Sequence, residues 1–194
     1  MSASRCPYRA MDTDATVAEA QRLWRAVSCD NLMINVPATD AGLPTIRHLI
    51  GEGINVNITL LFSQEVYERV VAAYLGGLED LLAHGGDPSK VASVASFFVS
   101  RIDVEVDKRF DDKIKSGRKA LSSLRGEVAI ANAKLAYQRY KRLFAGSRWD
   151  KLQSQGARTQ RLLWAGIGTK NKDYSDGDAP RVRRSYRDQG GRVT

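Results

Sequence analysis

The sequence predicts an α/β domain in which helices connect parallel strands, and two observations predict it. Short apolar runs typical of strands alternate along the chain with amphipathic segments of helical period, which is the order of parallel βαβ units. Polar side chains also gather near the carboxyl ends of the expected strands, where such sheets bind ligands. These patterns alone indicate an enzyme-like α/β domain with a ligand site at the strand ends, and they name no chemistry.

The composition fits one domain in a reducing compartment. The chain has 194 residues, of which 43% are hydrophobic, enough for a sizeable core. No apolar run approaches the length of a membrane span, and residues 1–9 contain no signal-peptide core, so we expect a cytoplasmic protein without a membrane partner. Cys6 and Cys29 lack the spacing of metal ligands, so we expect reduced thiols and no metal.

The net charge of +8 suggests an anionic partner, but the distribution of the charge argues against nucleic acid. Residues 177–194 contain five arginines and two aspartates, so much of the charge lies in this segment. The body of the chain has no basic stripe with interleaved aromatic residues, and we expect no nucleic-acid partner. Large apolar groups are few in residues 177–194, so we expect a disordered basic tail after a domain formed by residues 1–176.

The first third of the chain predicts helix, strand and helix. A helix is expected over residues 12–28, with Asp12 or Thr13 as its cap and one apolar face. The apolar run of residues 32–36 predicts a strand buried on both faces, closed by Pro37 and interrupted by the single polar residue Asn35. A short helix follows, with Pro44 in its first turn.

Three further strands and three helices are expected after residue 53. Residues 54–63 predict the clearest strand, in which Ile54, Val56, Ile58 and Leu60 alternate with the polar Asn55, Asn57 and Thr59. Ser63 can cap a long helix that reaches Leu82. The remaining expected elements are a strand over residues 91–100, helices over residues 103–115 and 127–144, and a strand within residues 159–168.

Several stretches resemble the transaldolases, and their order and spacing fit that family from about Cys6 to Asp176. These stretches are "AMDTDATVAEAQRLW", "NLMINVPATDAGLPTI", "EGINVNITLLFS", "VASVASFFVSRID" and "GTKNKDYSD". The resemblance implies a partial (β/α)8 barrel of the TIM type with about four of its eight strands. Transaldolases move a dihydroxyacetone unit between sugar phosphates through a lysine Schiff base, so the resemblance implies neither a cofactor nor a metal.

The resemblance assigns roles to six positions. The family pattern "NLMIKVPAT" has the Schiff-base lysine where this chain has Asn35, and a delocalised amide nitrogen cannot form an imine. Asn57 matches a residue that contacts substrate, and Thr59 matches one that positions the catalytic water. The positions that match phosphate-binding residues are Ser96, Arg101 and Lys170.

Two carboxylates of the family pattern are also unmatched. The position of a family glutamate is Ser4 here, and the family's acid–base aspartate lies on its first strand, upstream of the matched segment. For Asn35 the alternative to a site role is a satisfied strand amide without chemistry, which we favour. For Arg101 and Lys170 the alternative is ordinary surface charge, and we favour the phosphate role.

The sequence therefore predicts a transaldolase-family protein of the pentose phosphate pathway that is inactive. One alternative is an inactive remnant from a truncated or frame-shifted product. The other is a module that binds sugar phosphates or a protein without turnover. The expected ligands are sugar phosphates of the fructose 6-phosphate, sedoheptulose 7-phosphate and erythrose 4-phosphate type. Self-association is also expected, because four strands of an open barrel leave sheet edges exposed.

Overall fold

The computed structural model describes residues 2–3, 12–166 and 192–193, and the chain divides into two compact units. The first unit comprises Met1–Ser96 and Arg139–Arg161. The second comprises Phe97–Gln138 and Leu162–Thr194. Of the expected tail, only Arg192 and Val193 are among the described residues. The expected disorder of residues 177–194 therefore concerns residues that lie outside the described part of the chain.

The first unit is built on a parallel sheet. Strands β1 (Ser2–Ala3), β2 (Met33–Pro37), β3 (Val56–Leu61) and β4 (Ser93–Phe98) are neighbours in that order. β1 pairs with β2, and β2 with β3, in parallel, and Asn35 lies opposite Asn57. The predicted α/β class is confirmed, and β1 adds a short strand to those expected.

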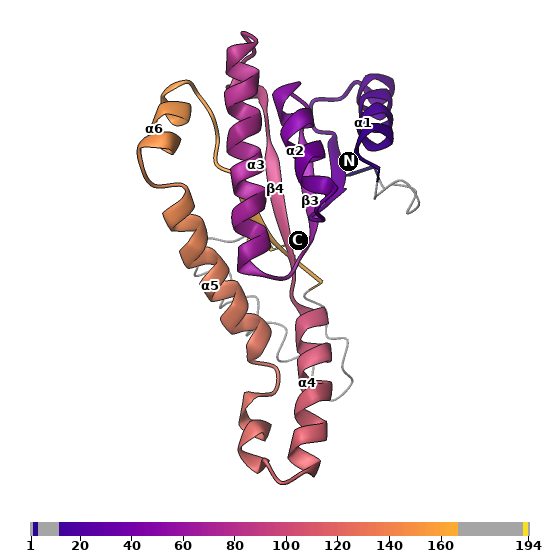
Figure 1. Cartoon of the computed structure of the whole chain (residues 1–194), viewed down its shortest axis with the longest axis vertical. Helices are drawn as coiled ribbons and strands as arrows, with labels where there is room; N and C mark the ends of the chain where they lie inside the picture. Colours follow the sequence, from indigo (N-terminus) through magenta and orange to yellow (C-terminus); the bar gives the residue numbers. More distant parts are fainter. Residues whose placement is uncertain (1, 4–11, 167–191, 194) are drawn as a thin grey trace. The chain divides into compact units, whose positions relative to one another are not determined.

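Helices pack side by side over this sheet (Figure 1). They are α1 (Thr13–Val27), α2 (Gly42–Gly51) and α3 (Gln64–Ala83). The 3-10 turn η2 (Pro88–Lys90) and the later helix α6 (Ser147–Ser154) each contact α3. α2 and α3 approach closely because Gly77 has no side chain. A Cβ there would lie 2.6 Å from the carbonyl oxygen of Arg47.

Both helix caps expected from the sequence are present. The Asp12 carboxylate accepts a hydrogen bond from the Ala15 N–H at 3.1 Å and begins α1. The Ser63 hydroxyl accepts one from the Val66 N–H at 3.2 Å and begins α3. Each side chain satisfies a backbone donor that the first helical turn leaves without a partner.

The prediction that β2 is buried on both faces is wrong. Ile34 and Val36 are fully buried, whereas Met33, Asn35 and Pro37 keep part of their surface exposed. The reason is that the helices of this unit cover one face of the sheet, and α2 contacts β2 and β3 there. Asn35 belongs to the other face.

The predicted alternation of burial holds only from Val56 to Thr59. Ile54, Val56 and Ile58 are buried as expected, but Leu60 is 42% exposed and Leu61 is fully buried. Leu60 has a φ of 61°, in the left-handed region that a leucine rarely adopts. This conformation shifts the alternation by one residue, so Leu61 takes the core position expected for Leu60.

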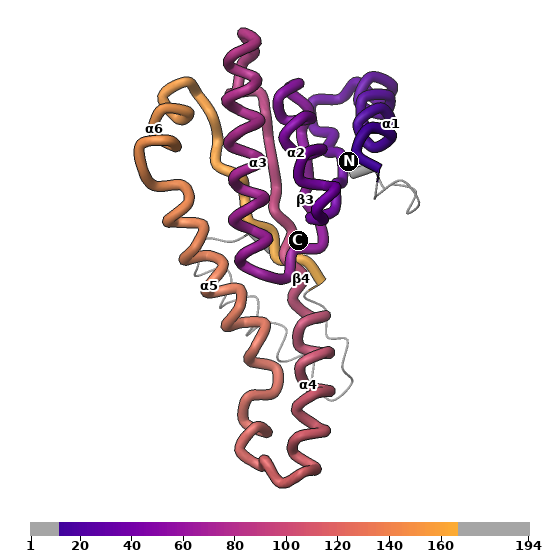
Figure 2. The backbone as a smooth tube through the Cα atoms, viewed as in Figure 1, coloured from indigo at the N-terminus to yellow at the C-terminus, as the bar shows by residue number. Residues whose placement is uncertain are grey.

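The second unit contains a helical hairpin (Figure 2). α4 (Ser100–Lys115) continues from the end of β4, the 3-10 segment η3 (Lys119–Leu124) turns the chain, and α5 (Val128–Leu143) returns. The Val99 N–H donates to the Ala165 carbonyl at 3.0 Å beside β5 (Arg161–Ala165). β6 (Arg192–Val193) pairs with β5 in parallel.

Two carboxylates of α4 hold the returning chain of the hairpin. Asp103 accepts a hydrogen bond from the Ala129 N–H at 3.0 Å, and Asp107 accepts one from the Gly126 N–H at 3.2 Å. Burial raises the pKa of Asp103 to about 6, and the nearby charges of Asp107 and Glu127 act in the same direction. The hydrogen bond from Ala129 offsets part of this effect.

The four main strands therefore lie where the sequence predicts them, and among the described residues the prediction missed α6, a helix of eight residues. It buries Trp149 and Leu152 alone, too few apolar positions for a helical period to be recognised. No helix among the described residues is long and apolar enough to cross a membrane.

Replacing adjacent leucines of β3 tests the shifted alternation. Leu61→Ala should lower the free energy of unfolding by about 2–5 kcal/mol, because it empties a fully buried site. Leu60→Ala should cost much less, and Leu60→Gly no more than Leu60→Ala, since glycine adopts positive φ without strain. Chemical denaturation measures all three, and equal costs for Leu60→Ala and Leu61→Ala would contradict the shift.

The raised pKa of Asp103 predicts a pH dependence of stability. The folded state holds the Asp103 proton more tightly than the unfolded chain does. The stability that this proton contributes is fully present below a pH of about 4 and is lost as pH rises through about 6. Asp103→Asn keeps an oxygen that can accept from Ala129 and should remove this contribution. The difference in unfolding free energy between the two proteins, measured from pH 4 to 7, should therefore change with pH, and a constant difference would contradict the assignment.

Candidate active site

A row of three hydrogen-bonded side chains crosses neighbouring strands of the first unit. Asn57 on β3 donates from its amide nitrogen to the Asn35 amide oxygen on β2 at 3.0 Å. The Ser96 hydroxyl on β4 donates to the Asn57 amide oxygen at 2.7 Å. We call Asn35, Asn57 and Ser96 the amide row. The structure thus brings together three of the six residues that the sequence selected.

The parallel register explains why these side chains meet. Asn35 and Asn57 are directly paired positions of β2 and β3, and in a sheet paired residues direct their side chains to the same face. Ile34, Val36, Val56 and Ile58 are buried on the helix-covered face, so the asparagines lie on the other one. Ser96 is 2% exposed, and its hydrogen bond to Asn57 satisfies the buried hydroxyl.

The chemistry of the amide row is that of a neutral hydrogen-bonding surface. None of its three side chains titrates in the physiological range, and none is an amine that can attack a carbonyl. Amide and hydroxyl groups can instead donate to and accept from the hydroxyls and carbonyl of a sugar. The row therefore suits binding of a polar ligand and offers no general acid or base.

Thr59 lies further along β3 than the amide row. It is paired with Pro37 and is half-buried. Its carbonyl oxygen accepts a hydrogen bond from the Ala38 N–H at 2.9 Å, which extends the contact between β2 and β3 beyond their paired residues. Alternation places its side chain on the same face as Asn57.

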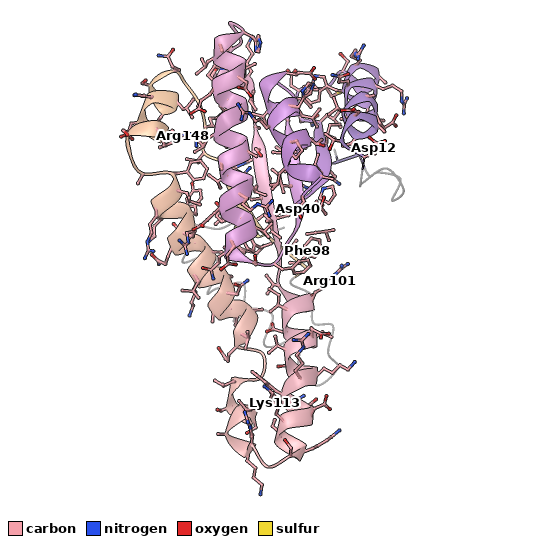
Figure 3. The ribbon with its side chains drawn as sticks, viewed as in Figure 1. Asp12, Asp40, Phe98, Arg101, Lys113 and Arg148 are labelled. Atoms are coloured by element: carbon pink, nitrogen blue, oxygen red, sulfur yellow. The ribbon has the colours of Figure 1, made fainter. Side chains whose placement is uncertain are left out.

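Arg101 lies in the second unit, in the first turn of α4, and is exposed. Its guanidinium carbon is 5.0 Å from the centre of the Phe98 ring, a cation–π contact that orients the side chain (Figure 3). Arg101 and the amide row belong to different units. Lys170 and Ser4 lie outside the described residues.

Asn55 is a polar residue whose role the sequence pattern misassigned. It was expected on the polar face of β3 but is 4% exposed. Its amide nitrogen donates to the carbonyl oxygens of Asp30 and Leu32, and its amide oxygen accepts from the Ala92 N–H at 2.7 Å. Asn55 therefore ties together the segments that enter β2, β3 and β4, and it supports the sheet on which the amide row lies.

The described residues contain no group of three His, Cys, Asp or Glu side chains that could hold a metal ion. The first unit is thus an α/β structure in which neutral hydrogen-bond donors and acceptors lie on neighbouring strands. The comparisons with known proteins then identify its family.

The family model for transaldolase/fructose-6-phosphate aldolase matches residues 4–178, and the chain belongs to this family. It is 48% identical over 176 residues to a transaldolase 2 of Nostoc sp. and 52% identical over 171 residues to a transaldolase of Mycolicibacterium paratuberculosis. These alignments cover 88% of the chain but 46% and 45% of the two relatives. The chain thus spans about half the length of the curated relatives that it matches.

Removing the central amide tests the row. Asn57→Ala deletes both of its hydrogen bonds and should lower the free energy of unfolding by about 1–3 kcal/mol, because the buried Ser96 hydroxyl loses its acceptor. Thr59→Ala, on the same strand and face, is the matched control and should cost less than about 0.5 kcal/mol. Chemical denaturation measures the loss of unfolding free energy in both variants. A loss in Asn57→Ala no larger than that in Thr59→Ala would contradict the hydrogen bonds assigned to the amide row.

Proposed function

We propose that this chain is a transaldolase-family protein that binds sugar phosphates without turning them over. The proposal rests on Asn35, which the resemblance places at the family's lysine position and which accepts a hydrogen bond from Asn57 at 3.0 Å. The family reaction is transfer of a dihydroxyacetone unit between sugar phosphates in the pentose phosphate pathway. That activity requires a Schiff base, which Asn35 cannot form.

The amide row lacks the nucleophile that a Schiff base requires. A Schiff base forms when a neutral amine attacks the ketone of the substrate, and burial of a lysine promotes this by lowering its pKa. The amide nitrogen of Asn35 shares its lone pair with the carbonyl group and is no nucleophile. Asn57 and Ser96 add hydrogen bonds and no titratable group, so the row does not replace the missing amine.

Binding can persist where catalysis does not. The ketone and hydroxyl groups of fructose 6-phosphate need hydrogen-bond partners, and the amide row provides these on a half-buried surface. The resemblance assigns the phosphate to Ser96, Arg101 and Lys170. Arg101 is exposed, carries a planar fork suited to a phosphate, and is oriented by Phe98. The ligand class is therefore sugar phosphates of the fructose 6-phosphate, sedoheptulose 7-phosphate and erythrose 4-phosphate type.

The cellular setting follows from the same resemblance. We propose a cytoplasmic location, where these sugar phosphates are metabolised. Self-association belongs to the proposal as well. Leu60 and Phe62 at the end of β3 are 42% and 39% exposed, and a second copy could cover them.

Borohydride trapping tests the role of Asn35. The unmodified chain should gain no mass when it is reduced in the presence of fructose 6-phosphate, because no imine forms. Asn35→Lys should gain the mass of the reduced adduct slowly. It should still turn over poorly, since Ser4 lies where the family has a glutamate and losing acid–base assistance costs on the order of 10²–10⁴ in rate.

Mass spectrometry of the reduced proteins provides the measurement. Asn35→Gln is the matched control, because it lengthens the side chain without adding an amine. An adduct on the unmodified chain or on Asn35→Gln would contradict the proposal. So would rapid sugar-phosphate turnover by Asn35→Lys, since it would show that the acid–base groups are complete.

A further inference from the structure

The first unit contains a polar cavity at the amino ends of β4 and β5. Its volume is about 430 Å³, and its polar lining includes Ser93, Gln153, Arg158, Thr159 and Arg161. None of the amide-row residues lines it. Catalytic sites of parallel barrels lie at the carboxyl ends of the strands, so a cavity at the amino ends is separate from the site that the family uses.

Two guanidinium groups make this cavity basic. Neither Arg158 nor Arg161 forms an ion pair with a carboxylate among the described residues. The Asp87 carboxylate interacts with Arg158. Its pKa is lowered first by hydrogen bonds from Ser89 and then by the charges of Lys90 and Arg158.

Fixed neutral groups surround these charges. The Arg158 guanidinium donates to the Ser89 carbonyl oxygen, which anchors it at the edge of the cavity. The Thr159 hydroxyl accepts a hydrogen bond from the Tyr140 hydroxyl at 3.1 Å, so its own proton can be donated to a ligand. The Trp149 ring is 4% exposed and packs edge-on against Phe144 at 5.0 Å, which gives the cavity a rigid aromatic wall.

We propose that this cavity binds a small phosphorylated metabolite through its phosphate group. The planar forks of Arg158 and Arg161 suit the paired oxygens of a phosphate, and Thr159 and Gln153 provide further hydrogen-bond donors. The volume lies in the range of small-molecule sites, and Trp149 and the neighbouring alanines offer an apolar surface to the organic part. This site is independent of the amide row and of the function proposed for it.

The test is a calorimetric titration of the full chain with inorganic phosphate at constant ionic strength, with sodium chloride as the matched salt. Arg161→Gln removes one fork from an exposed residue without breaking a hydrogen bond or ion pair that the structure shows. It should weaken phosphate binding at least tenfold. Arg142→Gln removes the same charge from an exposed position of the same unit outside the cavity, and should leave binding unchanged.

A further variant, Arg101→Gln, separates this cavity from the phosphate position that the family resemblance implies. Phosphate binding by the amino-end cavity should survive Arg101→Gln and should be weakened at least tenfold in Arg161→Gln. Equal affinity of Arg161→Gln and the unmodified chain would overturn the proposal, as would the absence of saturable phosphate binding. Loss of binding in Arg101→Gln alone would also overturn it, by assigning the phosphate to the other site.

Discussion

The hydrogen bond between Asn57 and Asn35 is the interaction on which the interpretation of this chain depends. It joins two paired positions of β2 and β3, and the bond from Ser96 extends it to β4. A lysine at position 35 would place an ammonium group or a neutral amine on this half-buried surface. An asparagine can be satisfied by a neutral partner, and Asn57 is such a partner.

The proposed function separates binding from catalysis, because the resemblance places Asn35 where the family has its reactive lysine. Family membership rests on the match over residues 4–178 and on identities near 50% to curated transaldolases. Catalysis, in contrast, requires particular reactive side chains. A fold that supports Schiff-base chemistry does not perform it without the nucleophilic amine. Arg101 on α4 and the cavity at the amino ends of β4 and β5 both suit phosphate, and they belong to different units.

The sequence predicts those parts of the fold that local physics determines. Asp12 and Ser63 are short polar side chains placed just before helical periods, and both are caps in the structure. The alternation in β3 predicts the buried Val56 and Ile58, because a strand of period two directs every second residue to the core.

The remaining features depend on contacts that no local pattern encodes. Leu60 adopts a left-handed φ that alternation cannot anticipate, and so the core residue is Leu61. Asn55 has the same residue type as Asn57 but serves the backbone, since the segments entering three strands converge on it. The sequence predicts Asn35, Asn57 and Ser96 as individual site positions. The hydrogen bonds that join them depend on the register between the strands, which the sequence does not show.

The most direct test of the central claim measures binding and turnover of fructose 6-phosphate in the same preparation of the unmodified chain. Isothermal titration reports binding, and release of glyceraldehyde 3-phosphate in the presence of erythrose 4-phosphate reports transfer of the dihydroxyacetone unit. The account predicts saturable binding with product release at the level of the buffer alone. Product release above that level would contradict it, because it would require a nucleophile that the amide row does not contain.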